Sequence, residues 1–345
     1  MRKSASFAGL GLLGALFLIP AQATAQPSPQ ATQPGAYVLF DNFTGAVIEA
    51  HNERTPLPPA SITKLLTALV ATNRLEPHAK VTVGPKAEAM PALKIGVKAG
   101  EAWPVDDLLH ALLLVSANDA AVALAEEISG SVDAFAADRY KVAGALGLAD
   151  SPVLNDPSGL DDAEFSANGG DRISARDMGI IARAASAQPE LAAMMGKQRY
   201  DFKGPNGEAR HMLNHNRLLK TYPGATGMKT GYTRQAKQTL VASATRENRS
   251  LIAVVLGSDR ASDFAAQLLD RGFAVPATPP SGADILPKIA VPISWSTAQA
   301  GEPVDNLTKR GGNGGLWLLV PAVVLVSVGS YGRRRWRNRD LIAGR

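Results

Sequence analysis

The chain has 345 residues, of which 46% are hydrophobic, and it contains no cysteine. This length allows one large domain or two small ones, and the lack of cysteine excludes disulfides, thiol catalysis and thiolate metal sites. The net charge of +5 comes from the last fourteen residues, which carry six arginines and one aspartate, so no basic face for nucleic acid is expected.

The N-terminus is typical of a secretory signal peptide that spans residues 1–25. Basic residues open the chain, residues 7–19 form an apolar run, and Ala23-Thr24-Ala25 is a small-residue cleavage site. The run is short and a proline ends it, which disfavours the alternative of an N-terminal membrane anchor. Residues 26–35 are polar and proline-rich, so we expect a disordered lead-in there.

The first chemical motif lies on a predicted helix from residue 62 to residue 75, after a predicted hairpin of strands 36–40 and 46–50. Ser61 and Lys64 are three residues apart and share one helix face. The serine lies where unpaired backbone N–H groups and the positive end of the helix dipole meet. A neutral lysine there could accept the serine proton and create a nucleophile. For this motif alone, a solvated pair on a surface helix is the alternative.

A second motif interrupts two apolar helices. Residues 105–115 predict a helix with acidic residues at its start, and residues 119–128 predict another. Ser116-Ala117-Asn118 is a polar turn between them, and such a turn would hold its polar side chains against the core. The same letters recur at Ser166-Ala167-Asn168, but that copy lies in a polar loop without flanking apolar helices, so we reject it.

The remaining elements place a third motif on a strand. We predict helices at 134–148, 174–187 and 262–273, a hairpin turn at 205–207, and strands at 224–232, 238–245 and 251–256. The first of these strands carries Lys229-Thr230-Gly231, in which lysine and threonine could bind a carboxylate and glycine allows close approach to the backbone. Strands at both ends and helices in the middle predict an α+β fold with one antiparallel sheet of about five strands, flanking helices and an all-helical subdomain.

The C-terminal part of the chain resembles a membrane anchor. Residues 276–315 are rich in proline and glycine and predict a linker. Residues 316–331 are uncharged and mostly apolar, which predicts a transmembrane helix, although a buried helix of a soluble domain is the alternative. The arginine-rich tail of residues 332–345 favours the membrane helix and places that end in the cytoplasm. With the signal peptide, this predicts a single-pass cell-membrane protein whose domain 36–275 lies on the outer side.

In this order the three motifs resemble the S-x-x-K, S-x-N and K-T-G motifs of penicillin-recognising serine enzymes. Residues 36–275 resemble the D-alanyl-D-alanine carboxypeptidases, the low-molecular-mass penicillin-binding proteins of serine peptidase family S11. Family-like segments beyond the motifs are Lys98–Glu101, Asn155–Leu160, Ser174–Met178 and Asn216–Leu219. The family usually has glycine where Ala117 stands, and members often carry a second all-β domain for which residues 276–315 are too few.

The resemblance implies a β-lactamase/transpeptidase-like fold and a catalytic role for each motif. Ser61 would attack the carbonyl of the penultimate D-alanine, and Lys64 would accept its proton. We expect the cation Lys229 to help keep that lysine neutral. Ser116 and Lys229 would relay a proton to the leaving D-alanine. No metal and no cofactor is implied.

The resemblance also implies how substrate would be held. Asn118 would bind the substrate amide and the lysine base, and Lys229 with Thr230 would hold the terminal carboxylate. The N–H groups of the nucleophile and of Tyr232, next to Gly231, would form the oxyanion hole. The expected partners are peptidoglycan stem peptides ending in D-Ala-D-Ala, with β-lactams as covalent inhibitors, the membrane through the C-terminal helix, and no nucleic acid.

The sequence disfavours most other functions but leaves one related activity open. His211 and His215 have a zinc-binding helical spacing, but no H-E-x-x-H glutamate or third ligand accompanies them. A class A β-lactamase would need a particular glutamate arrangement, and residues 154–165 offer only Glu164. A D,D-endopeptidase or transpeptidase shares the chemistry and stays open. A non-catalytic penicillin-binding membrane sensor is disfavoured because the short tail 332–345 cannot hold a signalling domain.

Overall fold

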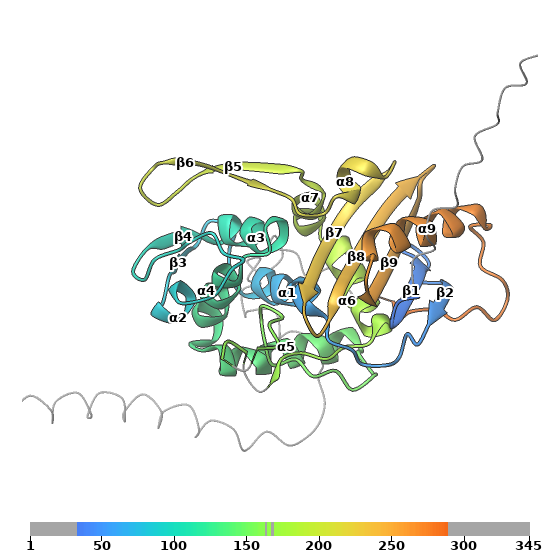
Figure 1. Cartoon of the computed structure of the whole chain (residues 1–345), viewed down its shortest axis with the longest axis horizontal. Coiled ribbons are helices and arrows are strands. Elements are labelled where there is room, and N and C mark those ends of the chain that lie inside the picture. The colour runs from blue at the N-terminus through green and yellow to red at the C-terminus, as the bar shows by residue number, and fades with distance from the viewer. Residues whose placement is uncertain (1–32, 163, 167–168, 289–345) are drawn as a thin grey trace, which may run out of the picture. The chain divides into compact units, whose positions relative to one another are not determined.

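The computed structural model describes residues 33–162, 164–166 and 169–288 (Figure 1). The predicted signal peptide, membrane helix and basic tail, with most of the lead-in and linker, lie outside the described residues. Among the described residues, no helix is long and apolar enough to cross a membrane.

The strands of the central sheet come from both ends of the described chain, as predicted. They are β1 (Ala36–Asp41), β2 (Val47–His51), β7 (Ala225–Thr233), β8 (Lys237–Arg246) and β9 (Arg249–Ser258). The five-stranded sheet has the order β2-β1-β9-β8-β7, and every pair in it is antiparallel. Strand β7, which carries the third motif, is therefore an edge strand.

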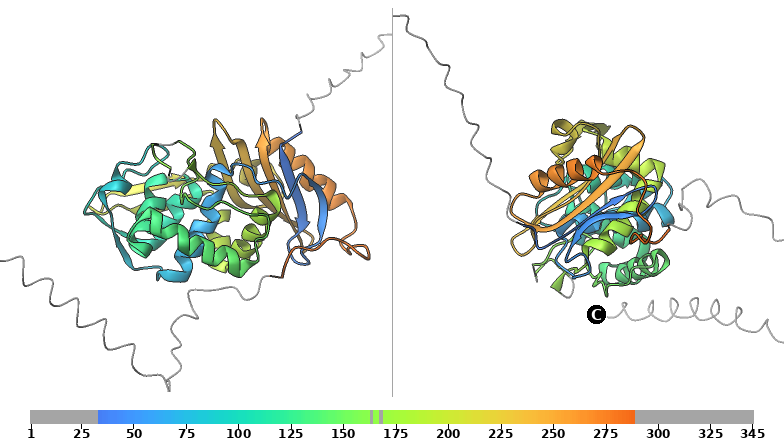
Figure 2. Two further views of the ribbon diagram at one scale, coloured as in Figure 1. Left: turned by 90° about the horizontal axis from the view of Figure 1, so that it is seen from below. Right: turned by 90° about the vertical axis from the view of Figure 1, so that its right-hand side faces the viewer.

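Helices cover both faces of this sheet and form a separate layer beside it (Figures 1 and 2). The helical elements are η1 (Ala60–Thr63), α1 (Lys64–Arg74), α2 (Pro85–Glu88), α3 (Val105–Leu114), α4 (Asn118–Ser129), α5 (Val132–Leu146), α6 (Ala175–Ala187), α7 (Pro189–Gly196), α8 (Leu218–Thr221) and α9 (Ala261–Ala274). Two small sheets pair β3 (Lys80–Thr82) with β4 (Ala102–Pro104), and β5 (Arg199–Lys203) with β6 (Ala209–Leu213). The helices α2, α7 and α8 were not predicted from the sequence.

The period-two alternation of the strands divides the core into two clusters. On β9, Ile252 and Val254 face the cluster that includes the helical layer, whereas Ala253 and Val255 face α9. Because both faces of the sheet are covered, the sequences of these strands are continuous apolar runs and do not alternate between apolar and polar residues. The predicted helix over residues 262–273 is confirmed as α9, and it packs across this outer face.

The predicted linker does not leave the body at residue 276. Leu286 is 1% exposed, and its N–H donates to the Gly45 carbonyl at 2.8 Å. Asp284 accepts two hydrogen bonds from the Arg176 guanidinium, at 2.5 and 2.8 Å. The packed body therefore extends past Val275, since two apolar residues in an otherwise proline- and glycine-rich segment pair with the β1–β2 turn.

Candidate active site

Ser61 lies in a single 3₁₀ turn rather than in the first turn of an α-helix. Residues Ala60–Thr63 form η1, and α1 begins at Lys64. In a 3₁₀ turn, residues i and i+3 eclipse each other, so the motif spacing brings both side chains together. The Lys64 Nζ atom lies 2.9 Å from Ser61 Oγ. The predicted contact between serine and lysine is thus present in a tighter turn than expected.

Two further acceptors surround the Lys64 amine, which is fully buried. Its Nζ donates to Asn118 Oδ1 at 2.9 Å and to the Ser158 carbonyl at 2.5 Å. A neutral amine has two N–H donors and one lone pair, so these two acceptors use both donors. The lone pair is then available to the Ser61 hydroxyl, which is the arrangement required of a general base.

Burial is the main reason that this base can be neutral. It lowers the pKa of Lys64 to about 7, and the carboxylates of Asp156 and Asp119 oppose the decrease. Burial also lowers the pKa of Lys229 well below its usual value, and the positive charge of Lys64 is the second cause of this decrease. The neutral state of Lys64 was expected to depend partly on Lys229. Its pKa is instead lowered by loss of hydration, and the charge effect between the two lysines lowers the pKa of Lys229.

The second motif occupies the turn between α3 and α4. Ser116 has a left-handed backbone (φ 62°) and is 3% exposed, and its Oγ has no hydrogen-bond partner within the described part of the chain. A buried hydroxyl without a hydrogen-bond partner is unusual, and it suits a group whose partner is the bound substrate. Ala117 has φ −59° and is fully buried, so this position does not require the family's usual glycine.

The third motif lies along β7. Lys229 is 1% exposed and donates to the Thr230 carbonyl at 2.9 Å. A Cβ on Gly231 would lie 2.8 Å from the Ser61 amide nitrogen and 2.4 Å from Thr239 Oγ1. Only glycine therefore lets the backbone before Tyr232 run beside the Ser61 N–H, as the predicted oxyanion hole requires. The Tyr232 side chain is 69% exposed.

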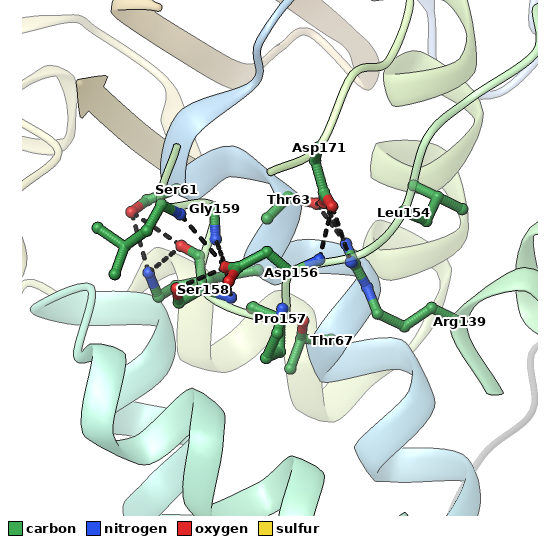
Figure 3. Close-up of polar contacts among 12 residues, drawn as sticks. Ser61, Thr63, Thr67, Arg139, Leu154, Asp156, Pro157, Ser158, Gly159 and Asp171 are labelled. Carbon is green, nitrogen blue, oxygen red and sulfur yellow. Dashed lines mark hydrogen bonds and ion pairs between the residues drawn. The ribbon is translucent and has the colours of Figure 1, made fainter. Parts of the chain in front are cut away.

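The loop of residues 155–160, which was not predicted to belong to the site, completes it (Figure 3). The Ser158 carbonyl that binds Lys64 is fixed because Asp156 Oδ1 accepts from the N–H groups of Ser158, Gly159 and Leu160. Segment 155–160 resembled the family, but a backbone carbonyl has no signature in the side-chain sequence.

A buried ion pair supports this loop from behind (Figure 3). Arg139 donates to both carboxylate oxygens of Asp171, at 3.1 and 2.6 Å, and neither side chain is exposed. Asp171 also accepts from the Asp156 N–H at 2.8 Å and from the Thr63 hydroxyl at 2.5 Å. One carboxylate therefore connects α5, the 156–159 loop and the turn that carries Ser61.

The two histidines of a possible zinc motif do not share a helix. His211 lies on β6, and His215 follows that strand and donates its backbone N–H to Leu114. No group of three or more potential metal-ligating side chains occurs in the portion that the structure describes.

Comparisons with known proteins agree with this geometry. The family model described as D-alanyl-D-alanine carboxypeptidase matches residues 21–260. The chain belongs to the D-alanyl-D-alanine carboxypeptidase family. Family relatives include DacB2 of Mycobacterium tuberculosis (strain ATCC 25618 / H37Rv), which is 35% identical over 74% of this chain and 89% of its own. DacF of Bacillus subtilis (strain 168) is 34% identical over 82% of this chain and 75% of its own.

Solved structures show the same fold. A D-alanyl-D-alanine carboxypeptidase of M. tuberculosis H37Rv matches with a TM-score of 0.68 and 33% identity, over 76% of this chain and 98% of that one. A DD-transpeptidase variant of Streptomyces matches with a TM-score of 0.64 and 27% identity, over 72% of this chain and all of that one. The predicted transpeptidase-like α+β fold of the family is thereby confirmed for the described domain.

Proposed function

We propose that this chain is a serine-type D-Ala-D-Ala carboxypeptidase that removes the terminal D-alanine from peptidoglycan stem peptides and is acylated by β-lactams. The observation that carries the proposal is the 2.9 Å contact between Ser61 Oγ and Lys64 Nζ, a buried amine whose two other contacts are both acceptors. Family membership supplies the substrate class.

Acylation uses this contact directly. Ser61 Oγ attacks the carbonyl carbon of the penultimate D-alanine while its proton passes to Lys64 Nζ. Negative charge develops on the carbonyl oxygen, and the N–H groups of Ser61 and Tyr232 stabilise it. The C–N bond then breaks. Ser116 delivers its proton to the nitrogen of the departing D-alanine and takes up the proton that Lys64 had accepted, so that the amine is neutral again. Water hydrolyses the ester and restores the Ser61 hydroxyl.

Substrate binding uses the remaining motif residues. Lys229 and Thr230 hold the terminal carboxylate through a positive charge and a hydroxyl. Asn118 binds the substrate amide on the acyl side, next to the base that its Oδ1 already contacts. Gly231 lets the peptide approach β7, whose outer edge has no strand partner in the sheet.

Two related activities share the acylation step. A class A β-lactamase activates its deacylating water with a glutamate; here Glu164 is exposed, and Asp156 is bound to its own loop. For transpeptidation, an amine replaces water as the acceptor, and a similar Streptomyces structure bears the name DD-transpeptidase. We therefore keep D,D-transpeptidase or endopeptidase action as the second candidate.

The decisive experiment measures D-alanine release from a peptide ending in D-Ala-D-Ala. The wild-type protein releases D-alanine and forms a covalent benzylpenicillin adduct that decays over minutes or longer, whereas Ser61→Ala does neither. Release that persists in Ser61→Ala contradicts the assignment. Rapid turnover of benzylpenicillin indicates a β-lactamase, and transfer of the acyl group to added glycine in place of water indicates a transpeptidase.

We further propose the organisation and location that the sequence favours. Residues 1–25 are a cleaved signal peptide, residues 316–331 anchor the protein in the cell membrane, and residues 332–345 form a cytoplasmic tail. The catalytic domain then lies on the outer side, where peptidoglycan is. Protease added to intact spheroplasts should remove the domain and leave a tag on the C-terminus protected; loss of that tag contradicts the orientation.

A further inference from the structure

A hydrogen bond between two segments of the active site lies beside the oxyanion hole, and the mechanism above does not use it. The Thr233 hydroxyl donates to Asp161 Oδ2 at 2.5 Å and accepts from the Ala236 N–H at 2.9 Å. Thr233 ends β7 and directly follows Tyr232, whose N–H is one of the two proposed oxyanion donors. Asp161 belongs to the loop that follows Ser158. The bond therefore joins β7 to the loop whose carbonyl binds the base.

The loop side of this bond is held in place. Asp156 Oδ1 accepts from the backbone N–H of Leu160, the residue before Asp161, at 3.2 Å. Gly170 packs against the same two residues, because a Cβ there would lie 2.8 Å from the Leu160 carbonyl oxygen and 3.2 Å from the Asp161 Cα atom. The Asp161 carboxylate is therefore carried by a backbone that two other segments hold.

The strand side of the bond needs such a support. β7 is an edge strand, and β8 is its only neighbour in the described five-stranded sheet. Thr233 pairs with Lys237 at the end of the β7–β8 ladder, so Tyr232 lies one residue from that end. The preceding Gly231 lies so close to the nucleophile that a Cβ on it would be 2.8 Å from the Ser61 nitrogen. An oxyanion hole depends on where its donors are held, and a displacement of about 1 Å can cost a hundredfold in rate.

We propose that Asp161 is a positioning residue for acyl transfer: its hydrogen bond with Thr233 holds the end of β7 so that the Tyr232 N–H meets the carbonyl oxygen of the scissile bond. The inference rests on the proposed function and assigns a further residue to that reaction. Asp161 touches no reacting atom in this role and acts only through Thr233 and the strand. Its task is to accept a hydrogen bond, so an amide oxygen at the same position should replace the carboxylate.

The test measures D-alanine release by variants of the full-length chain. Asp161→Ala should lower kcat/KM by about tenfold to a hundredfold, because an oxyanion donor is displaced. Asp161→Asn should restore most of the rate. Thr233→Val should lose at least as much as Asp161→Ala, whereas Thr233→Ser, which keeps the hydroxyl, should lose little. The double variant Asp161→Ala/Thr233→Val should lose no more than Thr233→Val alone, since both changes break one bond.

The next residue of the same loop provides a matched control. Asp162 is exposed, and its carboxylate accepts from the Glu164 N–H within the loop at 2.9 Å. Asp162→Ala therefore removes the same side chain one position further along without breaking a bond to β7. Its kcat/KM should equal that of the wild type.

A second readout separates positioning of the oxyanion donor from a general loss of structure. A boronic acid analogue of the peptide forms a tetrahedral adduct with Ser61 and places an oxygen in the oxyanion hole. Its inhibition constant should rise in Asp161→Ala by about the factor by which kcat/KM falls. The dissociation constant of the intact peptide, measured in a Ser61→Ala background, should stay unchanged, because the contacts to the terminal carboxylate and the amide remain.

Three results would overturn the inference: wild-type kcat/KM in Asp161→Ala, an equal loss in Asp162→Ala, or weaker peptide binding at unchanged boronate affinity. If Asp161→Ala or Thr233→Val does not fold, the other variant decides, because it breaks the same bond from the opposite side. A wild-type protein that releases no D-alanine from any peptide contradicts the proposed function instead.

Discussion

At the scale of single residues, Lys64 has three hydrogen-bond partners, and only one of them, Ser61, can also donate a hydrogen bond to it. The Ser158 carbonyl and the Asn118 carbonyl oxygen can only accept, so they bind N–H groups in either charge state of the amine. Ser61 Oγ carries its own hydrogen and can reverse the direction of its hydrogen bond. Loss of a proton from Lys64 therefore turns the serine into a donor without moving any heavy atom.

This behaviour predicts the acidic limb of the pH profile. Only neutral Lys64 can accept the serine proton, and burial lowers its pKa from 10.5 to about 7. The kcat/KM for D-alanine release should therefore rise with pH through an apparent pKa near 7. A profile from pH 5 to 10 measures it. An apparent pKa near that of a free lysine would show that burial does not neutralise this base.

The sequence was sufficient to predict the side chains of this site but not the backbone carbonyl that binds its base. Ser61 and Lys64 were predicted to touch because their spacing is local, and Lys229 and Gly231 were placed on a predicted strand. Ser158 was missed because its contribution is a carbonyl, which every residue has. The depressed pKa of Lys64 likewise depends on burial by segments distant in sequence.

At the scale of elements, two glycines let separate segments meet at the nucleophile. Gly159 has φ +80°, and a Cβ there would lie 2.1 Å from the Ala60 carbonyl oxygen. Gly159→Ala should therefore displace either the 156–159 loop or η1, and benzylpenicillin acylation should fall by at least about a hundredfold, as a shift of the order of 1 Å can cost.

Gly130→Ala is the matched control for this prediction. Gly130 has φ +78° and closes α4, but nothing lies within 4 Å of an added Cβ. That variant should lose only about 1 kcal/mol of stability through backbone strain and should keep its acylation rate. Equal acylation rates in the two variants would show that the contact between Gly159 and η1 is unimportant.

The buried ion pair behind the loop gives a prediction about stability. Asp171→Asn leaves the charge of Arg139 buried without a counter-ion, which should lower the free energy of unfolding by about 3–5 kcal/mol. Urea unfolding measures it. The control is Asp201→Asn, which removes the partner of Arg199 at an exposed site. This variant should leave the free energy of unfolding unchanged. Similar stability of the two variants would contradict a structural role for Asp171.

At the scale of the whole molecule, the central sheet joins the two ends of the described domain. Strands from its first and last thirds pair directly, because β1 lies beside β9. The sequence predicted this arrangement from the positions of apolar runs at both ends. It did not predict that residues 284–287 pack on the body, because composition alone classed residues 276–315 as a linker.

The packed segment should contribute measurably to stability. A protein that ends after residue 275 loses Leu286, whose burial contributes about 2 kcal/mol, and leaves the Arg176 guanidinium without Asp284. Its melting temperature should be at least about 4 °C below that of a protein ending after residue 288. Equal melting temperatures would show that the segment only rests on the surface.

Because two lysines are buried at the active site, substrate binding should be accompanied by an exchange of protons with the solvent. Burial disfavours charge on Lys229, and a bound carboxylate offsets that penalty. At pH values above the lowered pKa of Lys229, peptide binding should therefore take up protons, and departure of D-alanine should release them. The heat of binding, measured with Ser61→Ala to prevent turnover, would then vary with the ionisation enthalpy of the buffer. Affinity would weaken as pH rises while the acylation step accelerates, so the best working pH is a compromise between the two lysines.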